Sequence, residues 1–159
     1  MTRRHDALIP LTHDHHHALH NARLLRKAAD SGDTDRVDAA RSFVQFFREQ
    51  SVMHFREEEE QIFPLVINHP ECPREAIVRI LTDHVRLHAL VDSLGTSAEE
   101  GSVEGDLMRE LADLLQAHIR YEEDTLFPAI EELVPSALGQ VSLAERRRGP
   151  IADREEAPT

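Results

Sequence analysis

Apolar side chains recur along this chain at intervals of three and four residues, in four long blocks separated by short polar stretches. Such spacing places the apolar residues on one face of an α-helix, where they can pack against a core. In block 12–30, Thr12 can cap the start of the helix, and Pro10 is expected to keep it from extending far upstream. The apolar stripe of this block is Ala18, Leu19, Ala22, Leu25 and Ala29.

The other three blocks, 34–67, 73–94 and 106–133, repeat this pattern. Pro64 and Pro128 are expected to kink or interrupt their helices, because proline removes a backbone donor from the helix interior. Residues 68–73 predict a turn, and residues 95–105 predict a loop-like region. The three stripes are Val37, Phe43, Val44, Phe47, Ile62 and Leu65; then Ile77, Ile80, Leu81, Leu87, Val91 and Leu94; then Leu107, Leu111, Leu114, Leu115, Leu126 and Ile130.

Four such helices joined by short connectors predict an all-α fold, an antiparallel up-down-up-down four-helix bundle. None of the blocks shows the strict alternation of a half-buried β-strand. After Pro135 the pattern predicts a short helix at 136–146 and then a polar tail that is expected to be disordered. The expected organisation is one bundle domain, residues 1–135, followed by the short helix and tail, residues 136–159.

The composition agrees with a helical globular protein. The chain has 159 residues, of which 40% are hydrophobic, so one domain can build a substantial core. Aromatic residues make up only 4%, and there are six glycines and no tryptophan, which favours helices over strands. No apolar run is long enough to span a bilayer, and the first residues do not resemble a signal peptide.

Charge and cysteine content narrow the possible partners and location. The formal net charge of −12 argues against a nucleic-acid partner or an anionic membrane surface, because phosphate groups attract basic proteins. Cys72 is the only cysteine, which excludes an internal disulfide and a thiolate metal cage. A reduced, cytoplasmic setting follows as the simplest expectation.

Histidines and glutamates interrupt the predicted inner faces. The strings HFREEEEQIFP, from His54, and HIRYEEDTLFP, from His118, are identical at six of eleven positions. Each string places a glutamate, Glu58 or Glu122, four residues after its histidine, and residues so spaced lie about 5–6 Å apart on one helix face. The first helix adds His15 to its stripe, and the third adds His84 and His88.

A single histidine on an apolar stripe usually belongs to a hydrogen-bonded core, and the acidic run 57–60 alone would be a solvated face. Five imidazoles and two carboxylates from four helices are different, because burying them without a cation would cost several kcal/mol. Nitrogen and oxygen ligands suit iron, manganese or zinc, and seven ligands suit two octahedral ions that share a bridge. The candidate metal ligands are His15, His54, Glu58, His84, His88, His118 and Glu122.

Two of these positions have alternatives. His16, with His20 one turn later, repeats the spacing of His84 and His88, although the face of His16 continues into Arg23. Glu123 follows Glu122 directly, and helical geometry together with the repeat favours Glu122. Tyr121 lies at the edge of the inner face, where a packed ring is the ordinary interpretation and a hydrogen bond to a bound ligand is the alternative.

At these residues the chain resembles the hemerythrin family, specifically the bacterial hemerythrin-like (HHE cation-binding) domains. The resemblance covers residues 11–133 and rests on D14-H15, H54-x-x-x-E58, H84-x-x-x-H88 and H118. It implies a non-haem di-iron centre within the bundle, with two iron ions joined by an oxo or hydroxo group and by the carboxylates of Glu58 and Glu122.

The resemblance also divides the ligands between the two ions. One iron would take His84, His88 and His118, and the other would take His15 and His54 and keep a position open for dioxygen, nitric oxide or peroxide. Oxygen-carrier hemerythrins have an aspartate five residues after the last histidine, whereas this chain has Glu122 four residues after His118. That difference weakens the case for oxygen carriage.

Three functions follow as hypotheses. The leading one is binding of a small ligand at the di-iron centre, for sensing, storage or detoxification. The second is an enzyme that processes peroxide or nitric oxide at the same centre. The third is an iron-homeostasis module in which the metal site is structural. No residue is assigned a separate catalytic role, and no organic cofactor is expected.

Overall fold

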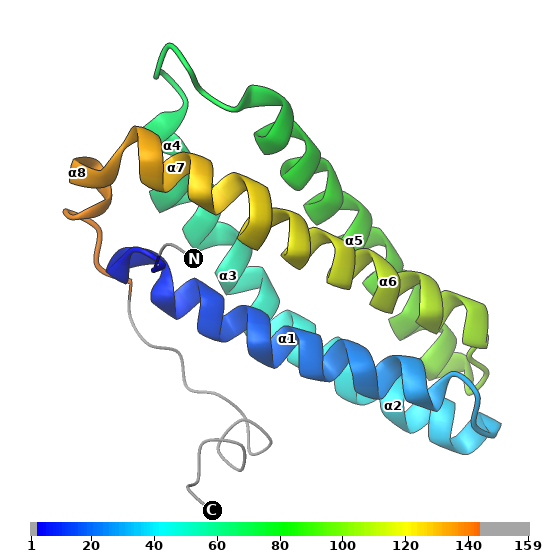
Figure 1. Ribbon diagram of the computed structural model, residues 1–159. Helices are drawn as coiled ribbons and strands as arrows, with labels where there is room; N and C mark the ends of the chain where they lie inside the picture. The colour runs from blue at the N-terminus through cyan, green and yellow to red at the C-terminus, as the bar shows by residue number, and fades with distance from the viewer. Residues whose placement is uncertain (1–2, 144–159) are drawn as a thin grey trace, which may run out of the picture.

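The structure is a computed structural model that describes residues 3–143. Every regular element within these residues is helical, which confirms the all-α prediction (Figure 1). The polar tail and the last part of the helix expected at 136–146 lie outside the described residues.

The first long helix, α1 (Ile9–Ala28), begins earlier than the sequence predicted. A 3₁₀ turn, η1 (Asp6–Leu8), precedes it, and Pro10 lies in its first turn, where a missing N–H leaves no hydrogen bond unmade. Thr12 is therefore not the cap. Its hydroxyl instead donates to a carboxylate oxygen of Glu123, at 2.7 Å.

The second block is helical from end to end, but in two places its backbone hydrogen bonds change from the α-helical to the π-helical pattern. It comprises α2 (Asp33–Phe46), η2 (Phe47–Ser51), α3 (Val52–Glu57), η3 (Glu58–Ile62) and α4 (Phe63–Val66). The segments η2 and η3 are π-helical, with N–H groups bonded to carbonyls five residues back. Pro64 does not break the helix, because it lies in the first turn of α4, directly after η3.

The third helix, α5 (Arg74–Glu100), continues through most of the region predicted as a loop. Leu94 and Ala98 are both buried, so the apolar stripe carries on past Gly95 and holds this stretch in the helix. The helix ends at Gly101, whose φ of 79° is the left-handed conformation that favours glycine at a helix end. Leu81, expected on the inner stripe, is exposed instead.

The last block comprises α6 (Gly105–Tyr121), a third π-helical segment η4 (Glu122–Leu126), and α7 (Phe127–Leu133). Gly105 allows α6 to start close to α1, since a Cβ at this position would lie 2.6 Å from the carbonyl oxygen of Ala29. The short helix predicted near the end is α8 (Pro135–Leu138), which ends well before residue 146.

The helices pack side by side, with α1 against α2 and α6, and with α5 against the same two helices (Figure 1). Their apolar faces form two separate clusters. Phe43, Phe47, Leu87 and Leu111 belong to the first cluster. Leu8, Leu11, Ile62, Ile80, Phe127 and Ile130 belong to the second. Between the two clusters, every long helical block contributes buried histidine or glutamate to a polar layer.

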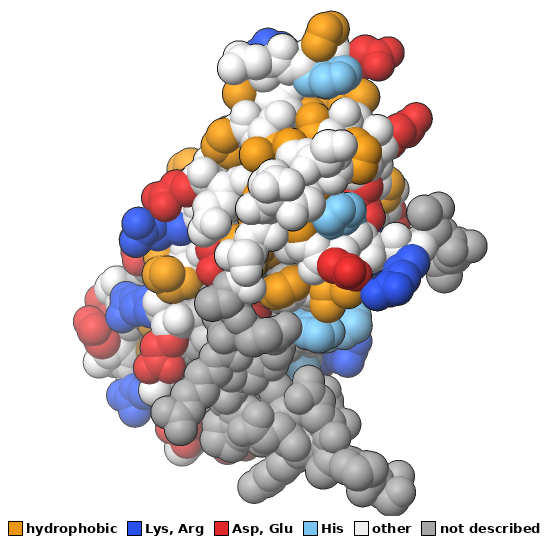
Figure 2. Space-filling model, turned by 90° about the vertical axis from the view of Figure 1, so that its left-hand side faces the viewer, with side chains coloured by type: hydrophobic (Ala, Val, Ile, Leu, Met, Phe, Trp, Pro, Cys, Tyr) orange, Lys and Arg blue, Asp and Glu red, His pale blue; other side chains and the backbone are white. Residues whose placement is uncertain are grey.

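The surface carries mixed charge. On the face drawn in Figure 2, acidic and basic side chains are interspersed rather than segregated, with hydrophobic side chains between them. None of the helices among residues 3–143 combines the length and the apolar character needed to cross a lipid bilayer.

Candidate metal centre

Six of the seven residues predicted as metal ligands meet in the polar layer. They form two groups with one glutamate in common, and the potential ligand atoms within each group lie within 4.8 Å of one another. All six side chains are buried. One group is His15, His54, Glu58 and Glu122, and the other is His84, His118 and Glu122.

The two glutamates lie between the histidine pairs. One oxygen of Glu58 is 2.9 Å from Nε2 of His54, and its other oxygen is 3.4 Å from Nε2 of His84. One oxygen of Glu122 lies 3.0 Å from Nε2 of His15 and 3.4 Å from Nε2 of His118. Each carboxylate therefore faces both groups, which is the position that a bridging ligand occupies.

The outer nitrogens of the histidines point to a second set of four carboxylates. Each helical block supplies a carboxylate that faces the histidine of the following block. The carboxylate of the last block faces the histidine of the first. The Nδ1–oxygen distances are 3.1 Å for His54 to Asp14, 2.7 Å for His84 to Glu59, 3.7 Å for His118 to Asp83 and 2.7 Å for His15 to Glu123. This ring fixes the orientation of the imidazoles, and the distance to Asp83 is longer than a hydrogen bond.

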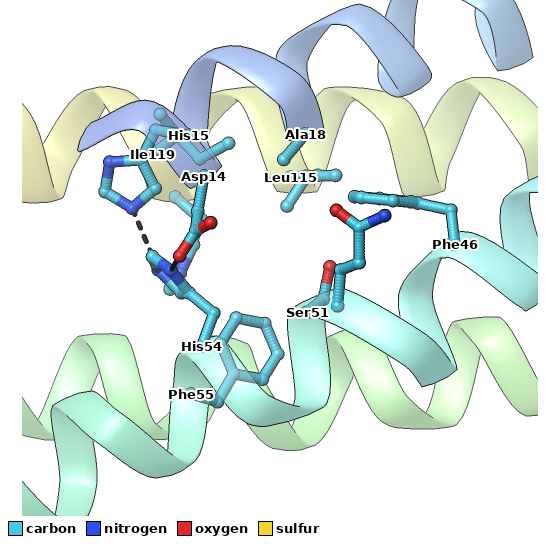
Figure 3. Close-up of a pocket in the computed structure, with 11 residues that line it drawn as sticks. Asp14, His15, Ala18, Phe46, Ser51, His54, Phe55, Leu115 and Ile119 are labelled. Carbon is cyan, nitrogen blue, oxygen red and sulfur yellow. Dashed lines mark hydrogen bonds and ion pairs between the residues drawn. The ribbon is translucent and has the colours of Figure 1, made fainter. Parts of the chain in front are cut away.

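The ring of outer carboxylates also determines which nitrogen of each imidazole carries no proton. Carboxylates accept hydrogen bonds, so Nδ1 of His15 and of His54 carry the protons when the rings are neutral. Their Nε2 atoms then face each other with lone pairs at 3.1 Å (Figure 3). Two lone pairs at this distance repel, and a proton or a metal ion between them removes the repulsion. The geometry therefore favours a shared cation.

Several inner atoms of this layer make no hydrogen bond within the described residues. They are both carboxylate oxygens of Glu58, both of Glu122, and Nε2 of His84 and His118. Nε2 of His84 and of His118 lie 3.4 Å from an oxygen of Glu58 and of Glu122, respectively, but the angles do not suit hydrogen bonds, as expected for atoms that converge on a common point. Buried atoms without partners are costly, and a metal ion would satisfy them together.

The electrostatics of the layer also favour a cation. Burial opposes protonation of His15, yet the adjacent carboxylates of Glu122 and Glu123 raise the pKa of His15 above its usual value. Burial likewise opposes protonation of His54 and His84, and in both cases Glu58 raises the pKa. In the absence of metal, protons on the imidazoles compensate the negative field of the carboxylates.

The carboxylates respond in the opposite direction. Burial by itself would raise the pKa of Glu58, but His54 and His84 hold it well below its usual value. Burial also opposes ionisation of Glu123, whose pKa nevertheless falls to about 2 because His15, Thr12 and Arg4 surround its carboxylate. Both groups are therefore anionic at neutral pH, as a metal ligand such as Glu58 must be, and as suits Glu123, which accepts hydrogen bonds.

Two π-helical segments position the glutamates. Glu58 opens η3 and Glu122 opens η4. A π-helical turn holds one residue more than an α-helical turn, so it rotates the preceding residues relative to those that follow. In both segments the bulge comes immediately before a Phe-Pro pair, where the proline cannot donate the next hydrogen bond. The duplicated strings in the sequence therefore encode a duplicated backbone feature.

His88 is the predicted ligand that does not join the layer. Its side chain is exposed and lies edge-on to the rings of Phe47 and Phe55, with centroid distances of 5.4 and 6.0 Å. The ring of Phe55 also stacks on His84, at 3.9 Å. One helical turn carries His88 about 6 Å along the axis. The aromatic rings occupy that level, and His88 lies outside the two groups of potential ligand atoms, so its role as a ligand stays a prediction.

The alternatives left open by the sequence are placed as well. His15 is buried in the layer, whereas His16 is exposed on the outside of α1. Glu122 faces the histidine pairs, whereas Glu123 holds the outer nitrogen of His15. The ring of Tyr121 packs beside the second apolar cluster, and the guanidinium carbon of Arg79 lies 3.7 Å from its centroid. Tyr121 therefore takes the packing position rather than one at the centre.

A pocket opens beside the layer, on the side of the first apolar cluster (Figure 3). The space in it that a water-sized molecule can reach is about 20 Å³, which is room for a very small molecule. Apolar side chains such as Ala18, Phe46 and Leu115 form much of its wall, and Ser51 and Asp14 add polar groups. Because His15, His54 and His118 also line it, a molecule in this pocket would lie next to the candidate metal centre.

The ring of outer carboxylates was not predicted, although the sequence carries a signal for it. Each member is adjacent in sequence to a residue of the inner layer: Asp14 to His15, Glu59 to Glu58, Asp83 to His84, and Glu123 to Glu122. A residue adjacent to an inward-facing one points about 100° away, toward the neighbouring helix. Acidic neighbours of the ligands therefore indicated a second layer of contacts.

Comparison with known proteins agrees with this geometry. The family model described as the hemerythrin HHE cation binding domain matches residues 7–130, which is most of the chain. A search of curated proteins and a search of solved structures each found no match.

Proposed function

The chain belongs to the hemerythrin family, as a hemerythrin HHE cation binding domain, and on that premise we propose that it is a non-haem di-iron protein. The proposed ligand is a small molecule, dioxygen, nitric oxide or peroxide, and the proposed role is sensing, storage or detoxification. The buried cluster of histidine and glutamate is compatible with a metal-binding site.

The observation that carries the proposal is that two groups of ligand atoms share Glu122. His15 and His54 would hold one iron, and His84 and His118 would hold the other. Glu58 and Glu122 would bridge the two ions, together with an oxo or hydroxo group. Imidazole nitrogen and carboxylate oxygen are suitable donors for iron, and no thiolate lies among them.

This assignment differs from the one implied by the resemblance. Here each ion receives two imidazoles, whereas the resemblance gives three imidazoles to one ion and two to the other. Octahedral ions with two imidazoles and two shared carboxylates keep open positions on both sides of the pair. The proposal includes an antiparallel up-down-up-down arrangement of four helical blocks as the scaffold, since each block contributes at least one member of the layer.

The pocket lined by Ala18, Leu115 and Ser51 supports small-molecule access. Its mostly apolar wall suits a diatomic ligand, and the Ser51 hydroxyl and the Asp14 carboxylate could orient a more polar one such as peroxide. A cytoplasmic location is part of the same proposal and rests on the single cysteine, Cys72, which is typical of a reducing compartment.

An enzyme that processes peroxide or nitric oxide is the second candidate, and the open positions on both ions favour it. When bound, the iron pair would supply redox chemistry and Lewis acidity. Asp14 would hold the proton of His54 Nδ1 and faces the pocket. Peroxide disproportionation is balanced without an external reductant, because two peroxide molecules give two waters and one dioxygen.

The deciding experiment measures iron per chain by elemental analysis, together with the near-ultraviolet spectrum of oxidised protein before and after nitric oxide. Two irons per chain and an oxo-to-iron absorbance that nitric oxide changes are the expected results. A colourless protein without iron would overturn the proposal. If the spectrum does not respond but chelation melts the helices, the metal is structural, and the iron-homeostasis reading replaces it.

Turnover is tested separately with the iron-loaded protein. Oxygen release from peroxide above the rate of free iron, lost in His118→Ala, would assign the enzymatic role. Ligand binding without turnover would leave sensing or storage as the function.

A further inference from the structure

A second, larger groove shares His15 and Ile119 with the pocket described above, but its other lining residues are different. It runs between α1 and the block formed by α6 and η4, and its empty volume is about 970 Å³, including the space open to solvent. His15 and Glu123 lie at one end, and Arg26 and Gln116 lie at the other, where their side chains are 3.1 Å apart. The part of it that a water-sized molecule can reach is about 430 Å³, which accommodates a small organic molecule.

Three arginines line this groove: Arg23 and Arg26 from α1, and Arg120 from α6. Arg26 is engaged by Asp113 and Gln116. Within residues 3–143, neither Arg23 nor Arg120 takes part in any of the ion pairs or side-chain hydrogen bonds that the structure contains. In a chain with a formal charge of −12, two unpaired guanidinium groups facing one groove are a local excess of positive charge.

The acidic side chains of the groove do not cancel this excess. Glu123 is already paired with Arg4 at 2.7 Å and bonded to Thr12 and His15, so its charge is compensated by the protein itself. Asp124 is exposed, as Arg23 and Arg120 are, and follows Arg120 by one helical turn. Among the charged groove residues without an ion pair within residues 3–143, the two arginines therefore outnumber this one carboxylate.

We propose that this groove binds a small organic anion that carries two anionic groups, of the phosphate or carboxylate type, and that bridges Arg23 and Arg120. Guanidinium groups form bidentate, charge-assisted hydrogen bonds with phosphate and carboxylate oxygens. Two arginines from neighbouring helices can hold two such groups at once. A molecule with one anionic group would engage only one arginine and bind more weakly.

Of the inner layer and the outer carboxylate ring, only His15 and Glu123 are among the residues that line the groove, and the two arginines are not part of either, so this binding does not depend on which metal the centre holds. Long-range attraction cannot account for it, because the overall charge repels anions. Affinity would therefore arise from the local arginines and would fall when salt is added.

The test uses calorimetric titration of the full, metal-loaded chain with three related probes. The probes are 3-phosphoglycerate, with two anionic groups, glycerol 3-phosphate, with one, and glycerol, with none. We expect 3-phosphoglycerate to bind with a dissociation constant on the order of 1 mM or tighter, glycerol 3-phosphate to bind more weakly, and glycerol not to bind. Arg23→Gln combined with Arg120→Gln should raise the constant about tenfold or more.

The matched control combines Arg48→Gln with Arg56→Gln, which removes the same charge from exposed positions outside the groove. It should leave the affinity unchanged. No heat with 3-phosphoglycerate, or equal weakening in both double variants, would overturn the proposal. Unchanged binding in the groove variant that disappears when the metal is removed would assign the anion to the metal centre and overturn it as well. Circular dichroism of each variant establishes that the helices are intact.

Discussion

Glu58 and Glu122 occupy equivalent places in two helical blocks, because each is the first residue of a π-helical segment and accepts the backbone hydrogen bond of the phenylalanine five residues later. The donors are the N–H groups of Phe63 and Phe127. Both glutamates are fully buried, with 0% exposure, and both face two histidines. The two glutamates therefore lie in the middle of the candidate centre, between the histidines that they face.

The first prediction concerns the bridging role of these glutamates. Glu58→Gln keeps the size of the side chain but removes its charge and replaces one oxygen with an NH₂ group, which is a donor and cannot bind a metal ion. We expect the metal content to fall by at least about half, as measured by elemental analysis. Glu60→Gln is the matched control, since Glu60 is exposed on the same segment and pairs with Arg56. Full metal content in Glu58→Gln would show that the bridge is not needed.

A second prediction separates four histidine ligands from five. His88→Ala should retain both metal ions, because His88 is exposed and lies beside Phe47 and Phe55 rather than in the layer. His84→Ala should lose metal, because Nε2 of His84 faces Glu58. Metal per chain and the spectrum of each variant provide the comparison. Loss of metal in His88→Ala to the same extent would restore the five-histidine assignment.

Apolar periodicity predicted the helical blocks well, because residues such as Leu87 and Leu111 recur at helical spacing and are fully buried. It failed at Gly95, where the sequence predicts that the helix ends, although the buried Leu94 and Ala98 keep this turn in the helix. A pattern of side chains records which face is buried, but it does not record how far packing carries a helix past a weak residue.

The inner ligands could be predicted because histidine and glutamate four residues apart share a helix face. His88 shares that face with His84 as well, but it lies one turn further along, where Phe55 fills the layer. Whether a residue lies level with the centre along the helix axis depends on the neighbouring helices, and the apolar periodicity of one helix does not show it. The π-helical segments could not be predicted either. The repeated Phe-Pro pairs indicated an irregularity in the helix but not its pattern of hydrogen bonds.

The third prediction is a pH dependence of the metal-free protein. The pKa values of His15, His54 and His84 are raised above 6.5, so their contribution to stability is complete below that pH and is lost as pH rises through the raised values. The pKa of Glu58 lies well below 4.5, so its contribution is present above that pH and is lost as pH falls. The free energy of unfolding should therefore be highest between 4.5 and 6.5.

Urea denaturation of chelator-treated protein on both sides of this window tests the prediction. Each unit of pKa shift corresponds to about 1.4 kcal/mol, so the decrease above neutral pH should be measurable. Metal-loaded protein should show the opposite trend, because metal competes with protons for the imidazoles. A metal-free protein that grows more stable from pH 6 to about pH 8 would contradict the assignment of these histidines.

The fourth prediction concerns Arg4, which reaches the centre through Glu123. Arg4 lies 2.7 Å from one oxygen of Glu123, whose other oxygen holds Nδ1 of His15 at 2.7 Å. Arg4→Met should free Glu123 to move and lower metal affinity by about tenfold, as loss of outer contacts to a ligand typically does. Chelator competition measures the affinity. Arg3→Met is the control, since the partner of Arg3 among residues 3–143 is the exposed Asp6, and an equal loss there would exclude a specific role for Arg4.

The last prediction narrows the pocket without touching a candidate ligand. Ala18 is buried in the pocket wall with Leu115 and Ile119, so Ala18→Leu would place three additional carbon atoms in the path to the layer. We expect unchanged metal content and a several-fold slower spectral response to nitric oxide, at a cost in stability of about 1–3 kcal/mol. Ala40→Leu introduces comparable crowding at a fully buried position outside the pocket. Because both variants are strained but only Ala18→Leu obstructs the pocket, a slower response in that variant alone would identify this pocket as the route, and equal rates in both would place the route elsewhere.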